Sequence, residues 1–368
     1  MLVRKGIMNS FKFKKAEDFN PVDLGQSLCM NFDAVLGSFR EYPSKRINGA
    51  LGGYIYDVPQ FPEDQVKGGI HYAKYVELPT SLIPQRQPYF LKTFAENIRE
   101  IIKPGASFFD LGPGPDWSVR KNTIPALDIL KPSLYMPVDL EPEFTEEACK
   151  VISQEFPDMK VSNLAGDFHQ EVLPKTETSV SIIWYPGSTL GNLPSLPRQT
   201  FLANKFVKEH LALLRQFANA QRKVHTRYLI LLMDSKKEDI QSMLNLYASS
   251  DAVGCFRSIL FKLKRDLQAY NFDPDALIYK PHWNAQNSTV EHVFTATKTQ
   301  TFRINNCFTN SWATVKILAG ERYVLANSIK PSAEEMQKML IRSGWEHLKS
   351  EADTKKQFHI HLARVYSK

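Results

Sequence analysis

The sequence has few cysteines, no repeats and no long apolar run, and each absence excludes a class of protein. Cys29, Cys149, Cys255 and Cys307 are far apart and form no Cys-x-x-Cys pair, so neither a zinc site nor a disulfide framework is expected. The longest apolar run, near 228–233, is too short to cross a bilayer. No apolar segment follows the basic N-terminus, which argues against a secretory signal. A cytoplasmic protein with no membrane partner is therefore predicted.

The composition is that of a globular protein with an excess of positive charge. The chain has 368 residues, which is enough for two domains or for one large domain with an added subdomain. Apolar residues make up 43% of the sequence and charged residues 23%. The net charge is +7, and residues 196–237 hold nine Lys and Arg against two Asp and Glu. A solvated basic face on a mostly helical stretch is the simpler interpretation of this segment. Contact with a polyanion remains an alternative.

Short apolar segments alternate with helical patterns in the central part of the chain. Pro88 suits the first turn of a helix that carries an apolar stripe, and residues 201–217 carry a second stripe. The predicted strands are 107–111, 135–140, 160–165, 179–184 and 228–233. Strands that alternate with helices predict an α/β fold with a parallel, doubly wound sheet.

The alternation stops after Asp234, where the chain turns to a different pattern. Residues 244–271 look helical, and 291–302 and 322–328 look like strands. Ser332 to Glu335 form a capping box that opens a helix closed by Gly344, and 358–365 is a final strand. Four segments are therefore predicted. They are an N-terminal part of a substrate-binding domain (1–87), a core (88–236), an inserted second part of the substrate domain (237–329) and a C-terminal part of the core (330–368).

The first predicted strand leads into a glycine-rich loop, Asp110-Leu-Gly-Pro-Gly-Pro-Asp116. Glycines after a strand let the backbone approach a ligand where a Cβ would clash. The dinucleotide fingerprint is incomplete, because Trp117 stands where a third glycine would be required. Such a loop can also simply turn the chain. As a ligand site, it fits a nucleoside better than a pyrophosphate.

The next three strand ends also carry polar or small residues. Asp139 can accept hydrogen bonds from both ribose hydroxyls, although an Asp here could instead cap the next helix. Asp167 and Phe168 suit an adenine amino group and ring. The fourth strand ends in Pro186-Gly-Ser-Thr-Leu-Gly-Asn192, which is expected to line the cleft beside the transferred group. Ligands of open α/β sheets bind at these carboxyl ends.

Four motifs give the sequence a family resemblance. They are Asp-Leu-Gly-x-Gly at 110–114, Pro-Val-Asp at 137–139, Gly-Asp-Phe at 166–168 and Gly-Ser-Thr-Leu-Gly-Asn at 187–192. Over about residues 70–365 the chain resembles the histidine Nα-methyltransferases of ergothioneine biosynthesis and their relatives. Further similarity includes Tyr247, the 271–274 segment, Glu291, and Ser328 before Lys330-Pro331. The last of the four motifs is the most specific, since it is long and unlike ordinary methyltransferase motifs.

The resemblance implies a Rossmann-like class I methyltransferase core, an added α+β substrate-binding lid, and S-adenosylmethionine as the cofactor. It places Asn192 and Tyr247 on the substrate's amino-acid moiety as the catalytic positioning groups. The other implied substrate residues are Glu291, His292, Ala326 and Ser328. The implied cofactor residues are Gly112, Pro113, Gly114, Arg120, Asp139, Leu140, Asp167, Phe168, Pro186, Gly187 and Ser188. No metal is implied.

The sequence departs from the histidine-specific pattern inside the substrate pocket. Ala326 stands where an acid contacts the imidazole, and His292 replaces a pocket methionine. The basic residue after the glycine loop is displaced, with Arg120 the candidate to replace it. Loss of a buried polar partner removes discrimination in favour of its ligand, so histidine is not the expected substrate. His292 could equally be a strand residue satisfied by a neighbour.

These observations favour an N-methyltransferase of specialised metabolism that acts on the amine of a small amino-acid-like or aromatic molecule, as a monomer or homodimer. A catalytically impaired cofactor-binding interaction protein is the main alternative. A nucleic-acid methyltransferase is less favoured, because the fourth strand ends in Tyr-Pro-Gly-Ser rather than an Asp/Asn-Pro-Pro-aromatic loop. His359 and His361 share a strand face and are interpreted as a solvated or hydrogen-bonded pair rather than metal ligands.

Overall fold

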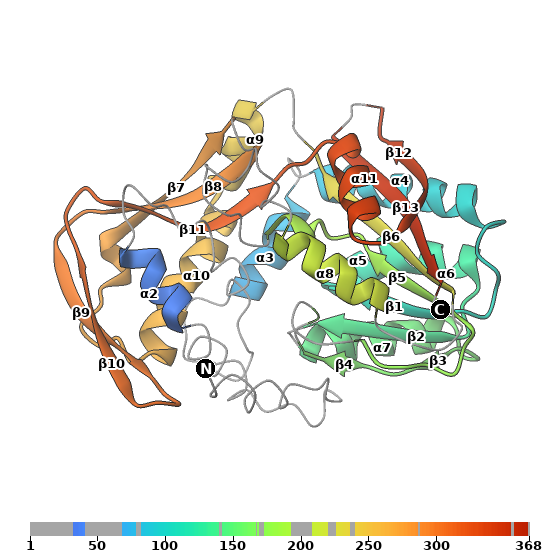
Figure 1. Cartoon of the computed structure of the whole chain (residues 1–368), viewed down its shortest axis with the longest axis horizontal. Helices are drawn as coiled ribbons and strands as arrows, with labels where there is room; N and C mark the ends of the chain where they lie inside the picture. Colours follow the sequence, from blue (N-terminus) through green and yellow to red (C-terminus); the bar gives the residue numbers. More distant parts are fainter. Residues whose placement is uncertain are drawn as a thin grey trace.

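Most of the predicted strands lie in one large sheet of the computed structural model (Figure 1). The structure describes residues 32–40, 68–78, 82–139, 142–166, 168, 173–192, 208–219, 226–235, 240–285, 288–354 and 357–366. Within them, eight strands form the sheet in the order β12-β13-β6-β5-β1-β2-β3, with β4 also beside β2. Their bounds are β1 Ser107–Leu111, β2 Leu134–Asp139, β3 Lys160–Val161, β4 Leu164–Ala165, β5 Val180–Tyr185, β6 Thr226–Asp234, β12 Glu346–Ala352 and β13 Phe358–Tyr366.

The strand order reverses at β1, which pairs in parallel with β2 on one side and with β5 on the other. The pair β5–β6 is also parallel, whereas β13 runs antiparallel to β6 and β12 antiparallel to β13. A reversal of this kind sends the connections of neighbouring strands to opposite faces and leaves a crevice at the carboxyl ends of β1 and β5. The crevice lies where the glycine loop and the 186–192 segment emerge.

Helices bury both faces of the sheet. One face is covered by α4 (Leu82–Ile98), α6 (Ile124–Leu130) and α7 (Pro142–Glu155), and the other by α8 (Lys208–Asn219) and α11 (Ala333–Arg342). Phe108 packs among the first set and its neighbour Phe109 among the second, because successive strand residues point to opposite faces. The expected Rossmann-like α/β fold is confirmed.

A second group of elements lies beside the sheet in Figure 1. It contains α2 (Phe32–Arg40), α3 (Gly68–Glu77), α9 (Ile240–Tyr247) and α10 (Ser250–Asp266). Its strands are β7 (Leu277–Asn284), β8 (Thr289–Ala296) and β11 (Arg322–Ile329) in one antiparallel sheet, and β9 (Gln300–Asn306) with β10 (Ser311–Ile317) in another. We call this group the second lobe and the large sheet with its helices the core lobe.

One hydrophobic cluster unites the second lobe. It joins Val35 of α2 and Tyr75 of α3 with Ile259 of α10 and Phe294 of β8, all of them buried. Segments from before and after the first part of the core therefore share one apolar interior. Residues 32–40 and 68–77 of the proposed N-terminal part therefore pack with the inserted 237–329 part, whereas residues 82–87 begin α4 and belong to the core lobe, so the proposed boundary at 87 lies too late in the sequence.

Three local expectations differ from the structure. Pro88 lies inside α4, which begins six residues earlier, at Leu82. The missing N–H of Pro88 costs only the bond to the carbonyl of Pro84, close to the helix start, so the helix tolerates it. The predicted strand 160–165 is divided into β3 and β4, and 291–302 contains the end of β8, a turn and the start of β9.

Other local expectations are confirmed, and some elements were not foreseen. Ser332 and Glu335 form the reciprocal capping box of α11, and Gly344 follows that helix with a φ of 95°. Strands β7, β10 and β12 were not predicted from sequence, nor were helices α2 and α3 in the N-terminal region. Part of the predicted 201–217 helix lies outside the described residues, and α8 covers the remainder.

The cysteine expectation needs a correction. Cys307 is disulfide-bonded, whereas Cys149 and Cys255 carry free thiols. Cysteine spacing therefore missed a disulfide and no longer supports a reducing compartment. Among the described helices, none is both long and apolar enough to cross a membrane.

Three histidines form a hydrogen-bonded row on β12 and β13. His359 Nε2 lies 2.9 Å from the carbonyl oxygen of Pro331, and its Nδ1 lies 2.8 Å from Nε2 of His361. His361 Nδ1 in turn lies 3.1 Å from Nε2 of His347. The expected His359–His361 pair is thus present. Since a carbonyl only accepts, His359 must carry its proton on Nε2, and this fixes the other two rings in the same neutral form.

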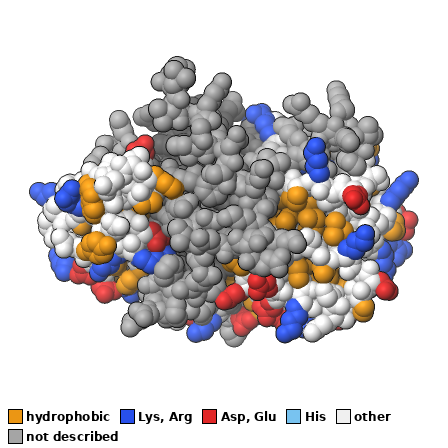
Figure 2. All heavy atoms as spheres, turned by 90° about the horizontal axis from the view of Figure 1, so that it is seen from below, with side chains coloured by type: hydrophobic (Ala, Val, Ile, Leu, Met, Phe, Trp, Pro, Cys, Tyr) orange, Lys and Arg blue, Asp and Glu red, His pale blue; other side chains and the backbone are white. Residues whose placement is uncertain are grey.

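Charged side chains are mixed on the face of the molecule in Figure 2. In its described part, Lys and Arg are interspersed with Asp and Glu over both lobes and do not gather into one patch. The basic segment 196–237 lies partly outside the described residues.

A buried carboxylate at the end of β1 makes fold stability depend on pH. Asp110 has no exposed surface, and its Oδ2 accepts hydrogen bonds of 2.9 Å from the hydroxyls of Thr123 and Tyr135. No donor to its Oδ1 is found within the described residues. Burial raises the pKa of Asp110 to about 7, although the two hydroxyls act to lower it.

We expect an Asp110→Asn variant to lose this pH dependence. The raised pKa means that the folded wild type holds a proton that the unfolded chain releases, so stability falls as pH rises from about 4 to about 7. About three pKa units correspond to at most about 4 kcal/mol. Urea unfolding of both proteins across this range measures the difference in free energy. Parallel curves for the two proteins would contradict the assignment.

The two lobes touch closely at Gly191, in the short helix η4 (Thr189–Asn192) after β5. A Cβ built on Gly191 would lie 2.7 Å from the backbone oxygen of Ile329 at the end of β11. Backbone at this distance cannot move aside as a flexible side chain can. The lobes are therefore in direct backbone contact beside Asn192.

A Gly191→Ala substitution is expected to destabilise the protein by about 1–3 kcal/mol, the usual cost of overpacking. Gly187→Ala is the matched control, because its Cβ would meet only the Thr189 hydroxyl, at 3.2 Å. Urea denaturation of the two variants compares the losses. An equal loss at both positions would show that the lobe contact is not the cause.

Candidate active site

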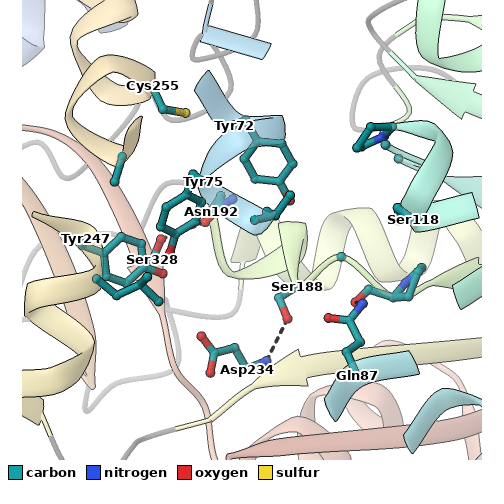
Figure 3. Close-up of a pocket in the computed structure, with 18 of the residues that line it drawn as sticks. Tyr72, Tyr75, Gln87, Ser118, Ser188, Asn192, Asp234, Tyr247, Cys255 and Ser328 are labelled. Atoms are coloured by element: carbon teal, nitrogen blue, oxygen red, sulfur yellow. Dashed lines mark hydrogen bonds between the residues drawn. The ribbon is translucent and has the colours of Figure 1, made fainter. Parts of the chain in front are cut away.

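A cavity opens at the crevice of the large sheet, between the two lobes (Figure 3). It encloses about 1110 Å³, including its open mouth. The core lobe contributes Gln87, Gly112, Gly114, Ser118, Pro186, Gly187, Ser188, Asn192 and Asp234. The second lobe and its junction with the core contribute Tyr72, Tyr75, Tyr247, Cys255, Phe256, Ser328 and Lys330. One wall is thus mostly backbone and small polar groups, and the other is largely aromatic.

The glycine loop forms one side of this cavity. Gly112 and Gly114 have φ angles of 68° and 70°, in the left-handed region that favours glycine. Nothing lies within 4 Å of a Cβ built on Gly112, so the backbone surface there is bare. The Gly112 N–H donates to the carbonyl of Val138, 2.9 Å away, which fixes the loop beside β2. The loop therefore offers a nucleoside a bare surface, which fits S-adenosylmethionine.

The end of β5 supplies a strained polar turn on the same side. Ser188 has a φ of 56°, unusual for a residue with a side chain. Its Oγ accepts a hydrogen bond of 2.8 Å from the backbone N–H of Asp234, drawn as a dashed line in Figure 3. This bond joins the ends of β5 and β6. Pro186 and Gly187 line the cavity directly before it.

Three other predicted cofactor residues do not line the cavity but lie near the glycine loop or the strand ends. Asp139 is buried at the end of β2, where its carbonyl accepts from Gly166 N–H at 2.9 Å. Phe168 is buried with its ring edge-on to Tyr185, 5.5 Å between centroids. Pro113 lies between the two loop glycines.

Arg120 is placed differently from the rest of the predicted cofactor residues. Its guanidinium Nε bonds both oxygens of Asp116 at 2.9 Å on an exposed part of the helical turn after the loop. Arg120 is not among the residues that line the cavity. Leu140 and Asp167 lie outside the described residues.

Asn192 and Tyr247 come from different lobes and line the same cavity. Asn192 ends η4, Tyr247 ends α9, and Figure 3 shows both near Tyr75 and Ser328. The hydroxyl of Ser328 donates to Asn192 Oδ1 across 2.9 Å. The Tyr247 ring stacks on Tyr75 at 5.9 Å between centroids. Residues that are far apart in sequence therefore lie in one cavity, and their roles in binding a substrate stay a prediction.

A buried ion pair forms the floor beside these residues. Lys330 Nζ lies 2.7 Å from Asp234 Oδ2 and 2.9 Å from the hydroxyl of Tyr247. Burial alone would lower the pKa of Lys330, but the Asp234 carboxylate and Tyr247 raise it above its usual value. The ammonium therefore stays charged inside the site.

His292 lies behind the cavity lining, inside the second lobe. Its ring is fully buried and stacks on Phe256 with 3.5 Å between centroids. Nδ1 is 2.8 Å from the Tyr279 hydroxyl, and Nε2 is 3.3 Å from Ser328 Oγ. Burial, together with the charge of Lys330, keeps the pKa of His292 well below its usual value, so the ring is neutral.

The two positions that depart from the histidine-specific pattern face each other. Ala326 of β11 is the direct cross-strand partner of His292 on β8. Glu291 points to the opposite face of β8, because neighbouring strand residues alternate. Its Oε1 accepts from Asn284 Nδ2 at 2.7 Å, and its Oε2 lies 3.4 Å from His282 Nδ1. Glu291, His292 and Ala326 are not among the residues that line the cavity.

Sequence reasoning missed several groups of the site. Asp234 was noted only as the point where the strand pattern ends, and Lys330 only as part of a motif. A charged residue directly after an apolar strand was the available signal for both. Tyr72 and Tyr75 gave no comparable signal, since a tyrosine at helical spacing is usually part of a core.

Known proteins share this sequence pattern over most of the chain. A family model described as "Histidine-specific methyltransferase, SAM-dependent" matches residues 44–365. The histidine N-alpha-methyltransferase of Mycolicibacterium smegmatis is 24% identical over 233 residues, and that of Mycobacterium tuberculosis is 22% identical over 231. Each match covers 62% of this chain and 66% of the relative, slightly under two thirds of its length.

Solved structures similar to this chain include two methyltransferases. Magnesium protoporphyrin IX methyltransferase from Synechocystis, with bound S-adenosylhomocysteine, is 10% identical with a TM-score of 0.38, covering 95% of this chain and 100% of its own. An S-adenosylmethionine-dependent methyltransferase from Clostridium acetobutylicum is 10% identical with a TM-score of 0.38, covering 75% and 90%.

The family match spans both lobes and includes the glycine loop, the 187–192 segment and Tyr247. The expected resemblance is confirmed by that match. The chain belongs to the family of S-adenosylmethionine-dependent, histidine-specific methyltransferases.

Proposed function

We propose that this protein transfers a methyl group from S-adenosylmethionine to the amine of a small amino-acid-like or aromatic molecule other than histidine. The observation that carries the proposal is the shared cavity, where the glycine loop faces Asn192 and Tyr247. A cofactor over the loop and a substrate against the second lobe would then meet at the end of β5. The crevice of an open α/β sheet is the usual place for such a site.

The cofactor supplies the activated methyl group, so this chain's own contribution is positioning and charge. In the proposal, the loop backbone and Asp139 hold the nucleoside, while Ser188 and Gly187 lie beside the transferred group. Asn192 and Tyr247 hold the amino-acid moiety of the acceptor. The aromatic wall excludes water from the other side. These groups can align an amine with a methyl group without a metal or a covalent intermediate.

The acceptor must reach the site as a neutral amine, because an ammonium has no lone pair to attack the methyl group. The charge of Lys330, 2.9 Å from the Tyr247 hydroxyl, disfavours a second cation nearby and so favours the neutral form. Asp234 offsets part of this effect through its ion pair with Lys330. Lys330 is therefore proposed to favour binding of the neutral amine, whose proton passes to solvent before the acceptor enters the cavity.

The choice against histidine rests on the pair Ala326 and His292, which lie behind the cavity lining, where His292 contacts the lining residues Phe256 and Ser328. Ala326 offers no carboxylate to an imidazole, and the ring of His292 directly faces it across the strands. A site that lacks the polar partner of a ligand binds it less well by a large factor. The relatives named above act on histidine according to their names, so this departure separates the chain from them.

The cellular setting remains a set of predictions. Specialised metabolism, a cytoplasmic location and a monomeric or homodimeric state were expected from sequence. The disulfide of Cys307 weakens the argument for a reducing compartment and leaves the enzyme class unaffected.

The decisive test is incubation of the protein with S-(trideuteromethyl)-adenosylmethionine and acceptor amines. The panel pairs amino acids with their decarboxylated amines, such as tryptophan with tryptamine, and includes histidine and a cell extract. We expect a labelled product from one amine class, detected by mass spectrometry, and none from histidine. An Asp139→Ala variant, used as the control, should give no labelled product. Binding of adenosylhomocysteine without turnover of any amine would instead favour an inactive cofactor-binding protein.

The exclusion of histidine should be reversible by restoring both departures. The double variant Ala326→Glu with His292→Met is expected to methylate histidine, because the acid can pair with the imidazole once the buried ring is removed. The gain over wild type should be at least about 100-fold in kcat/KM, as for other buried polar contacts. His292→Met alone is the matched control and should show no gain. Equal activity of the single and double variants would refute this explanation.

A further inference from the structure

The hydrogen bonds of His292 form a row that ends at a residue of the cavity. The row runs from the Tyr279 hydroxyl through the two ring nitrogens to Ser328 and then to Asn192 Oδ1. Stacking on Phe256, with 17° between the planes, fixes the plane of the imidazole. Nothing in the proposed methyl transfer yet uses this buried ring.

The number of protons on these groups limits the directions that the hydrogen bonds of this row can take. A neutral imidazole has one N–H, so one ring nitrogen donates and the other accepts. The hydroxyls of Tyr279 and Ser328 have one hydrogen each. One of these two must therefore donate to the ring, and the other must accept from it. Two arrangements satisfy this condition.

The distances favour one of the two arrangements. In the first, Tyr279 donates to Nδ1 at 2.8 Å, Nε2–H donates to Ser328, and Ser328 donates to Asn192 Oδ1 at 2.9 Å. In the second, Tyr279 donates to the carbonyl of Tyr247 and Ser328 donates to Nε2, both at 3.3 Å. Hydroxyl donors prefer the shorter contacts, which selects the first arrangement.

We propose that His292, protonated on Nε2, is a positioning residue that fixes the orientation of the Asn192 amide through Ser328. With Oδ1 occupied by the Ser328 hydroxyl, the amide presents its N–H groups to the cavity. These donors suit a carboxylate or carbonyl group on the acceptor. The role in substrate binding rests on the proposed function, whereas the ring's tautomer and the amide orientation do not.

Nuclear magnetic resonance tests the tautomer without any substrate. The full chain is labelled with ¹⁵N-histidine, and His292→Phe identifies the signals of the ring. We expect His292 to show a protonated Nε2 and an unprotonated Nδ1 at about pH 7.5 and still at about pH 6. A proton on Nδ1, or on both nitrogens, would overturn the proposal.

A second readout follows the amide itself. Ser328→Ala should shift the side-chain N–H resonances of Asn192, assigned with Asn192→Ala, in protein labelled uniformly with ¹⁵N. His292→Phe should shift the same resonances, because its effect passes through Ser328. Resonances that move with Ser328→Ala and remain unchanged in His292→Phe would show that the ring does not act on the amide.

Kinetics with the amine found in the labelling experiment test the consequence. His292→Phe should raise KM about tenfold, the effect of losing one well-aligned hydrogen bond to a charged group, with kcat changed less. In an Asn192→Ala background the same change should add nothing, because its effect acts through Asn192. If the effects of the two substitutions on KM were additive, His292 would not act through Asn192 and would contribute only to packing.

Two controls separate this proposal from general damage. Tyr279→Phe removes a hydrogen bond on the far side of the ring and leaves Nε2–H in place, so KM should change about twofold at most. The dissociation constant of adenosylhomocysteine should be the same in wild type and His292→Phe. If no amine is ever methylated, the proposed function fails, and the resonance measurements still decide the role of His292.

Discussion

The ion pair between Asp234 and Lys330 is the interaction on which the arrangement of the site depends. Asp234 ends β6 of the large sheet, and Lys330 follows β11 where the chain returns from the second lobe. Both charges are largely removed from water, so each needs the other. The pair holds the end of β11 against the sheet and so places Ser328 beside Asn192. Removing either partner would leave an uncompensated charge in the cavity.

Most strands of the large sheet could be predicted from sequence because they are buried on both faces, whereas the partly exposed edge strand β12 could not. Such strands are mostly apolar runs that end at a glycine or a carboxylate. β1 ends before Gly112 and β2 ends at Asp139, and these strand ends mark the crevice. Asn192 and Tyr247 were predicted through motif similarity, since the 54 residues between them give no periodic signal that links the two. Their meeting in one cavity depends on how the second lobe packs.

The remainder of the site could not be predicted because it depends on tertiary contacts. Ala326 and His292 were each noticed, but their direct pairing follows from the register of β8 with β11. Glu291 resembled a pocket residue in sequence, yet strand alternation turns its carboxylate towards Asn284. Arg120 and Asp116 are four residues apart in a helical turn, a spacing that favours their mutual pairing. Local sequence alone did not show which partner Glu291 or Arg120 would bind in the folded chain.

The backbone contact at Gly191 limits how this site can diverge. A side chain at that position would displace the end of β11, and with it the cavity residues Ser328 and Lys330. The distance between the two lobes at this point is therefore tightly restricted. Positions 292 and 326 lie further along the strands, where a change in side-chain volume leaves the contact intact. Under the proposed function, the choice of acceptor can therefore be altered at positions 292 and 326 while the backbone contact that sets the distance between the lobes is kept.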